Sequence, residues 1–278
     1  MIHCANPVIW LKDHFIDCDF IDKQYFENKT TVYEVLRVIQ GVPLFLDAHL
    51  KRLIESVVKA GFFLSDSVMS ELKPIVIKLI NLNHLEKGNL ELALVFDSES
   101  GALINSLVYS IPVHYPTTEQ YQTGVDAMYY YAVRNNPSAK IKDQSLRDAA
   151  DIIIEKRSLY EVVLVDKYGR VTEGSRSNIF FVKENALFTA PEKMVLNGIT
   201  RIKVLDIAKS NGIDLQEKPV MYNELNKMDG AFLTGTSPQV LPIRLLEDHS
   251  FNPTNEVVMT MMSLYEKMID NYILSFRY

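Results

Sequence analysis

Apolar residues alternate with polar ones, or recur at helical spacing, through the first part of the chain. Residues 30–46, "TTVYEVLRVIQGVPLFL", predict two strands around a turn at Gly41. Residues 47–63 predict a helix that Asp47 caps and Gly61 ends. A second helix is predicted over 65–85, where Pro74 implies either a kink or a later start. Strands are predicted at 89–97 and 104–113.

The second part of the chain mixes strands and helices in the same way. Strands are predicted at 125–133, 161–165, 178–182 and 186–190, and residues 230–243 predict two more around a small-residue turn. Helices are predicted at 143–159, capped by Asp143, at 200–212, capped by Thr200 and ended by Gly212, and at 255–276. Mixed elements with hairpins favour an α+β fold with mixed sheets.

A polar, turn-rich stretch separates these two parts. Residues 114–124, "HYPTTEQYQTG", therefore predict a linker between an N-terminal domain, 1–113, and a C-terminal domain, 125–278. The chain has 278 residues, 47% of them hydrophobic and 23% charged, which is typical of a globular protein large enough for two domains.

Charge and cysteine content narrow the class of protein. A net charge of −6 argues against a nucleic-acid or anionic-membrane partner. No apolar run approaches the roughly 20 residues that cross a bilayer, and the start lacks the pattern of a signal peptide. Cys4 and Cys18 give neither a disulfide framework nor metal-ligand spacing, so we expect no metal and a cytoplasmic location.

Three small-residue turns of the second part have the composition of a phosphate site. They are "TEGSRSN" (172–178), "NGITR" (197–201) and "LTGTSPQ" (233–239). A helix start such as "NGITR" binds phosphate through free amides and its dipole. Arg52, on a predicted helix, could hold a phosphate bidentately. Taken singly, Thr200 is explained as a helix cap and Arg52 as a surface charge.

A lysine and a carboxylate complete a possible cofactor site. Pyridoxal phosphate needs a lysine, phosphate anchors and an acid that keeps its ring nitrogen protonated. Glu173, between two predicted core strands, could be that acid through a charge-assisted hydrogen bond. Lys140 and Lys142 precede a helix and supply candidate amines. Taken alone, Glu173 could instead cap its own turn, and either lysine could be solvated.

Several segments, in order and spacing, resemble the class IV, or fold-type IV, pyridoxal-phosphate-dependent enzymes. They are "LDAHLKRL", "VTEGSRSNIFFVKENALFTAP", "VLNGITRIKVLDIAKSNGI" and "MDGAFLTGTSPQVLPI". The family includes branched-chain and D-amino-acid aminotransferases and aminodeoxychorismate lyases. The resemblance implies a two-domain α+β homodimer with the cofactor between the domains, and an amino transfer between an amino acid and a 2-oxo acid. A lyase releasing pyruvate and p-aminobenzoate, or a non-catalytic relative, is the alternative.

The resemblance also implies residue roles. Lys140, which lies 33 residues before Glu173, is similar to the Schiff-base lysine and proton shuttle, with Lys142 as its competitor. Glu173 matches the partner of the ring nitrogen. The remaining matches are to phosphate ligands and to the substrate side: Arg52, Ile199 through its amide, Thr200 and Thr236 for the phosphate, and Tyr33, Gly235 and Ser237 for the substrate.

Two departures from the family pattern leave the substrate open. Family members commonly have a glycine-aspartate-glycine turn before the strand of Tyr33, whereas this chain has "YFENKTTVYEV". That altered edge is the support for a non-catalytic relative. D-amino-acid aminotransferases and the lyases usually have an arginine after the strand that corresponds to "ELALVF". Here "DSESGALINS" follows, with no arginine or lysine, so their carboxylate-binding device is missing.

Overall fold

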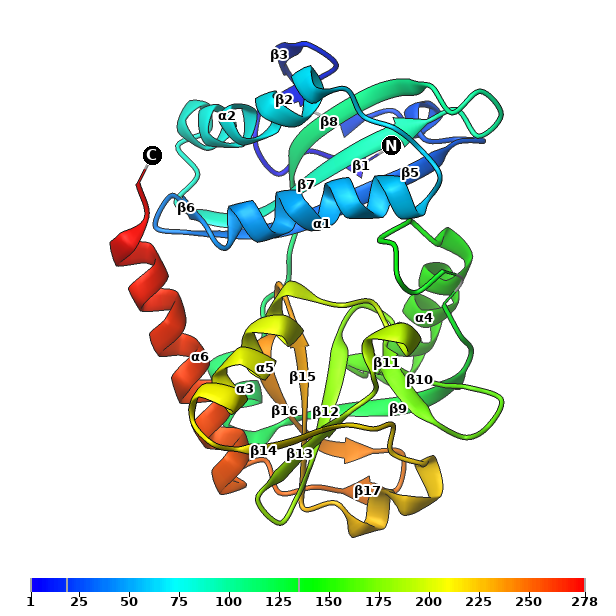
Figure 1. Ribbon diagram of the computed structural model, residues 1–278, viewed down its shortest axis with the longest axis vertical. Coiled ribbons are helices and arrows are strands. Elements are labelled where there is room, and N and C mark those ends of the chain that lie inside the picture. The colour runs from blue at the N-terminus through cyan, green and yellow to red at the C-terminus, as the bar shows by residue number, and fades with distance from the viewer. Residues whose placement is uncertain (1, 19, 135, 278) are drawn as a thin grey trace. The chain divides into compact units, whose positions relative to one another are not determined.

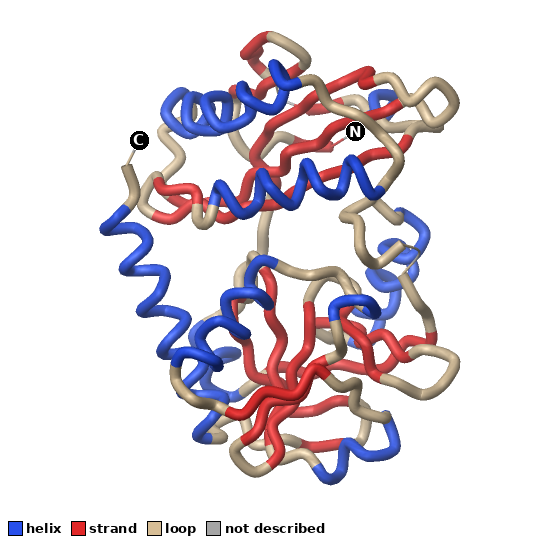
Figure 2. Tube along the Cα trace, viewed as in Figure 1, coloured by secondary structure: helices blue, strands red, loops and turns tan. Residues whose placement is uncertain are grey.

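The computed structural model describes residues 2–18, 20–134 and 136–277, and the chain so described forms two compact units (Figures 1 and 2). The first unit comprises Met1–His114, Ala139–Lys142 and Ile269–Tyr278, and the second comprises Tyr115–Ser138 and Asp143–Met268. Helices and strands are mixed in both, as predicted for an α+β fold. The predicted division at 114–124 stays a prediction; within it the structure has a short helix, α3 (Thr118–Thr123), with a capping box.

An antiparallel sheet forms the centre of the first unit. Its strand order is β3-β2-β8-β7-β5-β6. A short antiparallel ribbon, β1 with β4, and a 3₁₀ turn, η1, precede β5. The bounds of these elements are β1 Ile2–His3, β2 Val8–Leu11, β3 His14–Asp17, β4 Phe20–Ile21, η1 Lys23–Tyr25, β5 Thr30–Ile39, β6 Val42–Pro43, β7 Lys87–Phe96 and β8 Leu103–Ile111.

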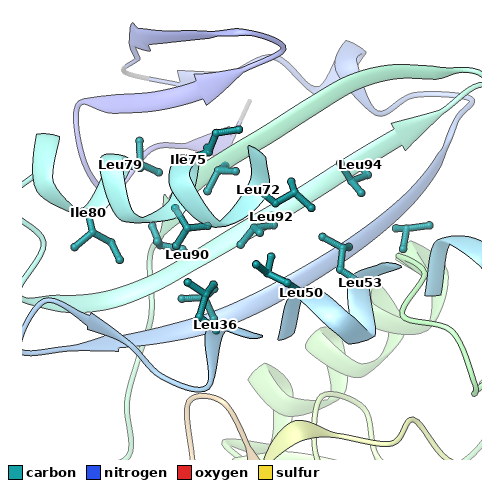
Figure 3. Close-up of a cluster of buried hydrophobic side chains, with 14 of the residues drawn as sticks. Leu36, Leu50, Leu53, Leu72, Ile75, Leu79, Ile80, Leu90, Leu92 and Leu94 are labelled. Atoms are coloured by element: carbon teal, nitrogen blue, oxygen red, sulfur yellow. The ribbon is translucent and has the colours of Figure 1, made fainter. Parts of the chain in front are cut away.

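Helices α1 (Leu46–Lys59) and α2 (Asp66–Leu82) pack against one face of this sheet. Their apolar residues recur at the predicted helical spacing and point toward the sheet (Figure 3). Leu53 of α1, Leu79 of α2 and Leu36 of β5 are fully buried in this cluster. Burial of a leucine contributes about 1.5–3 kcal/mol, so the cluster is a main source of stability for the first unit.

The predicted cap of α1 is wrong. Phe45 is the residue before the helix, and its φ of 53° is left-handed. Asp47 lies inside the first turn, and its carboxylate forms an ion pair of 2.8 Å with Lys73 of α2. The predicted end is confirmed, because α1 stops at Lys59 and Gly61 follows with a φ of 85°.

Helix α2 begins before its proline. Ser65 caps it by accepting a hydrogen bond from Val68 N, and the helix continues from Asp66 through Pro74 to Leu82. A later start is therefore excluded. Because Pro74 has no N–H, one hydrogen bond of the helix ladder is missing at this point.

The second unit is built on a sheet that closes on itself. Its strand order is β11-β10-β9-β16-β15-β12-β13-β14, β17 pairs with β16, and an additional pairing of β11 with β12 closes a ring. Parallel and antiparallel pairings both occur, as predicted for a mixed sheet. The strands are β9 Val125–Tyr131, β10 Glu161–Val165, β11 Val171–Gly174, β12 Asn178–Lys183, β13 Ala186–Thr189, β14 Asp214–Glu217, β15 Gly230–Gly235, β16 Gln239–Leu246 and β17 His249–Ser250.

The helices of the second part test three predicted boundaries. Asp143 caps α4 (Gln144–Arg157) by accepting a hydrogen bond of 3.1 Å from Leu146 N, as predicted. Thr200 does not cap α5 (Ile199–Ser210), because Gly198 occupies the cap position and Thr200 lies in the first turn. Gly212 follows α5 with a φ of 67°. The other helices are η2 Glu192–Met194, η3 Tyr222–Lys227 and α6 Glu256–Ser275.

A four-residue segment, Ala139–Lys142, belongs to the first unit although it is distant in sequence. It runs antiparallel to β5 through a bridge between Val32 and Ile141. Tyr33 N donates to Lys140 O at 3.1 Å, and Lys142 N donates to Thr31 O at 3.0 Å. The segment thus lies along β5 and fixes the backbone of both candidate lysines.

Within the described part of the chain, each helix is too short or too polar to span a bilayer.

Candidate functional site

The structure brings Lys140 and Tyr33 together in the first unit. The ammonium nitrogen of Lys140 lies 4.7 Å from the centroid of the Tyr33 ring. The backbone N of Lys140 donates to Ser56 Oγ of α1 at 3.1 Å. The Tyr33 side chain is buried, so its ring offers a fixed face to the amine. A cation over an aromatic face is attracted by about 0.5–2 kcal/mol, so the ring helps to orient the Lys140 side chain.

Lys142 has a carboxylate partner. Its ammonium forms an ion pair of 2.9 Å with Glu91 of β7, and Tyr109 Oη donates to the same carboxylate oxygen at 2.6 Å. Glu91 and Tyr109 are buried. Breaking a buried pair leaves an uncompensated charge, which is strongly unfavourable. Lys142 thus neutralises Glu91, and the choice between the two lysines as the reactive amine stays a prediction.

Arg52 holds a glutamate that the sequence patterns did not single out. Arg52 Nε donates to Glu34 Oε1 at 2.6 Å and Arg52 Nη2 donates to Glu34 Oε2 at 2.7 Å. His49 Nδ1 donates to Glu34 Oε2 at 2.8 Å. Burial of Glu34 would raise its pKa, but the Arg52 charge and the hydrogen bonds from both partners outweigh burial and hold the pKa far below its usual range. Glu34 is thus a buried anion at neutral pH.

His49 is buried and carries a depressed pKa. Burial is the largest cause, and it outweighs the hydrogen bond to Glu34, which alone would raise the pKa. The charges of Arg52 and Lys140 lower it further. His49 is therefore a neutral hydrogen-bond donor to Glu34 in the folded protein.

Replacing His49 by glutamine should flatten the acid dependence of stability. The pKa of His49 in the unfolded chain is 6.5. At lower pH, His49 therefore binds a proton in the unfolded chain but not in the folded protein. The free energy of unfolding therefore falls as pH falls, by at most about 1.4 kcal/mol per pH unit from this residue. Urea unfolding at about pH 7.5 and about pH 5.5 measures the difference. His84→Gln, at an exposed position, is the control; an unchanged pH dependence in His49→Gln would contradict the assignment.

Glu173 lies in a strand rather than in a turn. It belongs to β11, pairs in register with Asn178 of β12, and its side chain is buried. Oε1 accepts a hydrogen bond from Arg134 Nε at 3.1 Å, and Oε2 accepts one from Leu196 N at 3.1 Å. The turn follows at 175–177, so the prediction that Glu173 sits in the turn is wrong. These two donors fix the position of the buried Glu173 carboxylate.

Asn178 joins the three small-residue turns. Its Nδ2 donates to Leu196 O at 2.8 Å and contacts Glu173 Oε2 at 3.4 Å. A Cβ at Gly198 would meet Asn178 Oδ1 at 2.3 Å, so the backbone there passes directly against the amide. Asn178 also pairs in register with Thr234 of β15. The three turns predicted to form one site therefore come together in the second unit.

A buried glutamate shapes the turn that follows Glu173. Glu161 Oε1 accepts hydrogen bonds from Ser175 Oγ at 2.6 Å and Ser175 N at 3.2 Å. Glu161 Oε2 accepts one from Ser177 Oγ at 2.8 Å. Ser175 O in turn accepts from Arg134 Nη2 at 2.9 Å. The hydroxyls of Ser175 and Ser177 thus hold the turn in shape.

The remaining predicted residues lie at the start of α5 and in the β15–β16 turn. Ile199 and Thr200 are buried in the first turn of α5, and Thr200 Oγ1 lies 3.5 Å from Tyr265 Oη. Gly235, Thr236 and Ser237 are half-buried. A Cβ at Gly235 would lie 3.6 Å from Arg176 O, so this turn is next to 175–177.

Comparisons with known proteins agree on one family. The family described as Amino-transferase class IV matches residues 31–246. A D-alanine aminotransferase from Bacillus licheniformis is 33% identical over 239 residues, 82% of each chain. A probable branched-chain-amino-acid aminotransferase from Thermotoga maritima is 32% identical over 275 residues, 95% of this chain and 97% of that protein. The solved branched-chain amino acid aminotransferase from Escherichia coli has a TM-score of 0.79 at 20% identity, covering 95% of each chain.

Fold, motifs and relatives together define an enzyme of the aminotransferase class. More narrowly, the chain belongs to the class IV aminotransferases, a family that depends on pyridoxal phosphate. The family, the mixed α+β fold and the enzyme class predicted from the motifs are confirmed. The roles of individual site residues stay predictions.

Proposed function

We propose that this chain binds pyridoxal phosphate and uses it to move an amino group between an amino acid and a 2-oxo acid. The observation that carries the proposal is the buried Glu173 carboxylate, which Asn178 joins to the start of α5. When bound, the cofactor supplies a cationic ring that takes up electrons from the substrate Cα. The residues described below hold it, orient it and move the proton.

The residues at the start of α5 fit a phosphate. Gly198, at the cap position, has no side chain that could cap the first amides of α5, which suits this helix start to an anion. Thr234 Oγ1, beside Asn178, is buried with no hydrogen-bond partner among the described residues, as expected of a hydroxyl near a polar ligand. Ile199 through its amide, Thr200 and Thr236 would hold the phosphate, with Arg52 as a further ligand.

Lys140 and Glu173 have the chemistry for the two polar ends of the ring. Lys140 supplies an amine that carries the cofactor and later moves a proton from the substrate Cα. Glu173 accepts a hydrogen bond from the ring nitrogen and favours its protonated form. Arg134 and Leu196 N orient the Glu173 carboxylate.

The direct test is amino transfer by purified protein. An aminotransferase consumes amino acid only when a 2-oxo acid acceptor is present, and the cofactor-loaded protein should absorb at about 410–420 nm. Release of p-aminobenzoate from aminodeoxychorismate would instead identify the lyase. A colourless protein that does not take up pyridoxal phosphate would overturn the proposal. The homodimer and the cytoplasmic location stay predictions.

L-Amino acids are the proposed donors. The loop after β7 carries no cation from Asp97 to Asn105, and the Asp97 carboxylate is occupied by Ser100 N and Ser100 Oγ, both at 2.8 Å. It offers nothing to bind a carboxylate in the manner implied for D-amino-acid aminotransferases. With 2-oxoglutarate as acceptor, kcat/KM for L-valine or L-leucine should exceed that for D-alanine at least about tenfold, or about 1.4 kcal/mol. A preference for D-alanine would contradict this.

A further inference from the structure

Two thiols in the first unit lie almost within bonding distance. The Sγ atoms of Cys4 and Cys18 are 2.6 Å apart, and both side chains are half-buried thiols. A disulfide has an S–S length of about 2.05 Å, so an approach of about half an ångström would join them. They are the chain's only cysteines, so any intramolecular disulfide must be this one.

The backbone already brings the two thiols together. Cys4 directly follows β1, and Cys18 lies shortly before β4, to which β1 is paired with Ile2 opposite Ile21. Cys18 N also donates to Pro7 O at 2.7 Å. A ribbon of two-residue strands is marginal by itself. A bond between the sulfurs would therefore stabilise this ribbon.

The thiols are part of an apolar cluster under the N-terminal strands. Both pack against the buried residues of this cluster, which include Ile9, Tyr33 and Leu107. Cys18 also lines a cavity of about 240 Å³ together with Tyr25. A small reagent can reach a thiol in the wall of a cavity. The surrounding apolar packing keeps the two sulfurs close enough to bond with each other.

We propose that Cys4 and Cys18 form a redox-responsive modification site that closes to an intramolecular disulfide. A low-molecular-weight disulfide such as oxidised glutathione is the oxidant. One protein thiolate attacks it and releases one glutathione thiol, and the second protein thiolate then attacks the protein sulfur of the mixed disulfide and releases the other. The two protein thiols are oxidised by two electrons, and one glutathione disulfide is reduced to two thiols. Thiol pairs of this kind are transient sensors in a reducing compartment.

Intact-mass measurement tests the proposal on the full chain. The reduced protein is equilibrated in buffers of increasing glutathione disulfide to thiol ratio, and N-ethylmaleimide then labels the remaining thiols under denaturing conditions. We expect oxidised wild type to lose about 2 Da and to take up no label, while remaining monomeric on a non-reducing denaturing gel. Cys4→Ser and Cys18→Ser should each gain one glutathione instead.

Peptide mapping tests the proposal on the wild-type protein alone, without the two serine variants. Trypsin cleaves after Lys12 and Lys23, so peptides 1–12 and 13–23 separate unless Cys4 and Cys18 are bonded. Oxidised wild type should yield them as one linked species that reducing agent splits. Two glutathiones on wild type, disulfides between chains, or full labelling in the most oxidising buffer would each overturn the proposal.

Discussion

Replacing Lys140 by alanine should abolish amino transfer. The variant would lose both the amine that carries the cofactor and the group that moves the Cα proton. General acid–base catalysis alone contributes about 10²–10⁴-fold, and loss of the covalent role adds to it, so we expect kcat to fall by at least about 10⁴-fold. Steady-state assays with saturating pyridoxal phosphate, together with the absorbance of the loaded protein at about 410–420 nm, measure both losses.

Lys142→Gln is the matched control for Lys140→Ala. It removes the other candidate amine but leaves a hydrogen-bond donor for Glu91, so the buried carboxylate keeps a partner. We expect the control to retain the absorbance band and substantial turnover. The opposite result, an active Lys140→Ala and an inactive Lys142→Gln, would assign the reactive amine to position 142.

Replacing Glu173 by glutamine should lower kcat by about 10²–10⁴-fold. The amide keeps an oxygen that can accept from Leu196 N, but it removes the negative charge that would hold a protonated ring nitrogen. The loss should therefore appear in the chemical step, measured by single-turnover kinetics at saturating substrate, rather than in KM.

Glu217→Gln is a suitable comparison for Glu173→Gln, because it also neutralises a glutamate paired with an arginine in the second unit. Glu217 forms an ion pair of 2.7 Å with Arg201. If loss of an ion pair alone explained the effect, both variants would lose activity alike. A kcat of Glu173→Gln within about threefold of wild type would contradict the proposed role of Glu173 as partner of the ring nitrogen.

Most elements could be predicted because their patterns are local. Strand alternation and helical spacing depend on which face of each element is buried, and that information is written in consecutive residues. Caps were less predictable. Asp143 caps α4 as expected, whereas the positions expected of Asp47 and Thr200 are taken by Phe45 and Gly198. A helix can begin wherever neighbouring backbone satisfies its first amides, and a residue's capping propensity alone does not locate that point.

The grouping of the three small-residue turns was predictable, but the network of contacts around them was not. The three turns could be grouped because each has small residues beside a strand end or helix start. Arg134 and Asn178 gave no comparable signal, since one is an arginine in a loop and the other opens a strand. The Arg134 contact joins Glu173 to a loop 39 residues earlier in the chain, and the Asn178 contact depends on the pairing of β11 with β12. Glu34 was missed because an acidic residue inside an apolar strand signals burial only once Arg52 and His49 are seen beside it.

The pairing of Ala139–Lys142 with β5 has a consequence for solubility. Without this segment, β5 would be an edge strand over much of its length, with unpaired backbone donors and acceptors. Exposed edge strands pair with strands of other molecules. The segment Ala139–Lys142, which carries the candidate reactive amine, therefore also covers an aggregation-prone strand edge. Loss of this pairing should therefore expose the backbone of β5 and favour self-association of the protein.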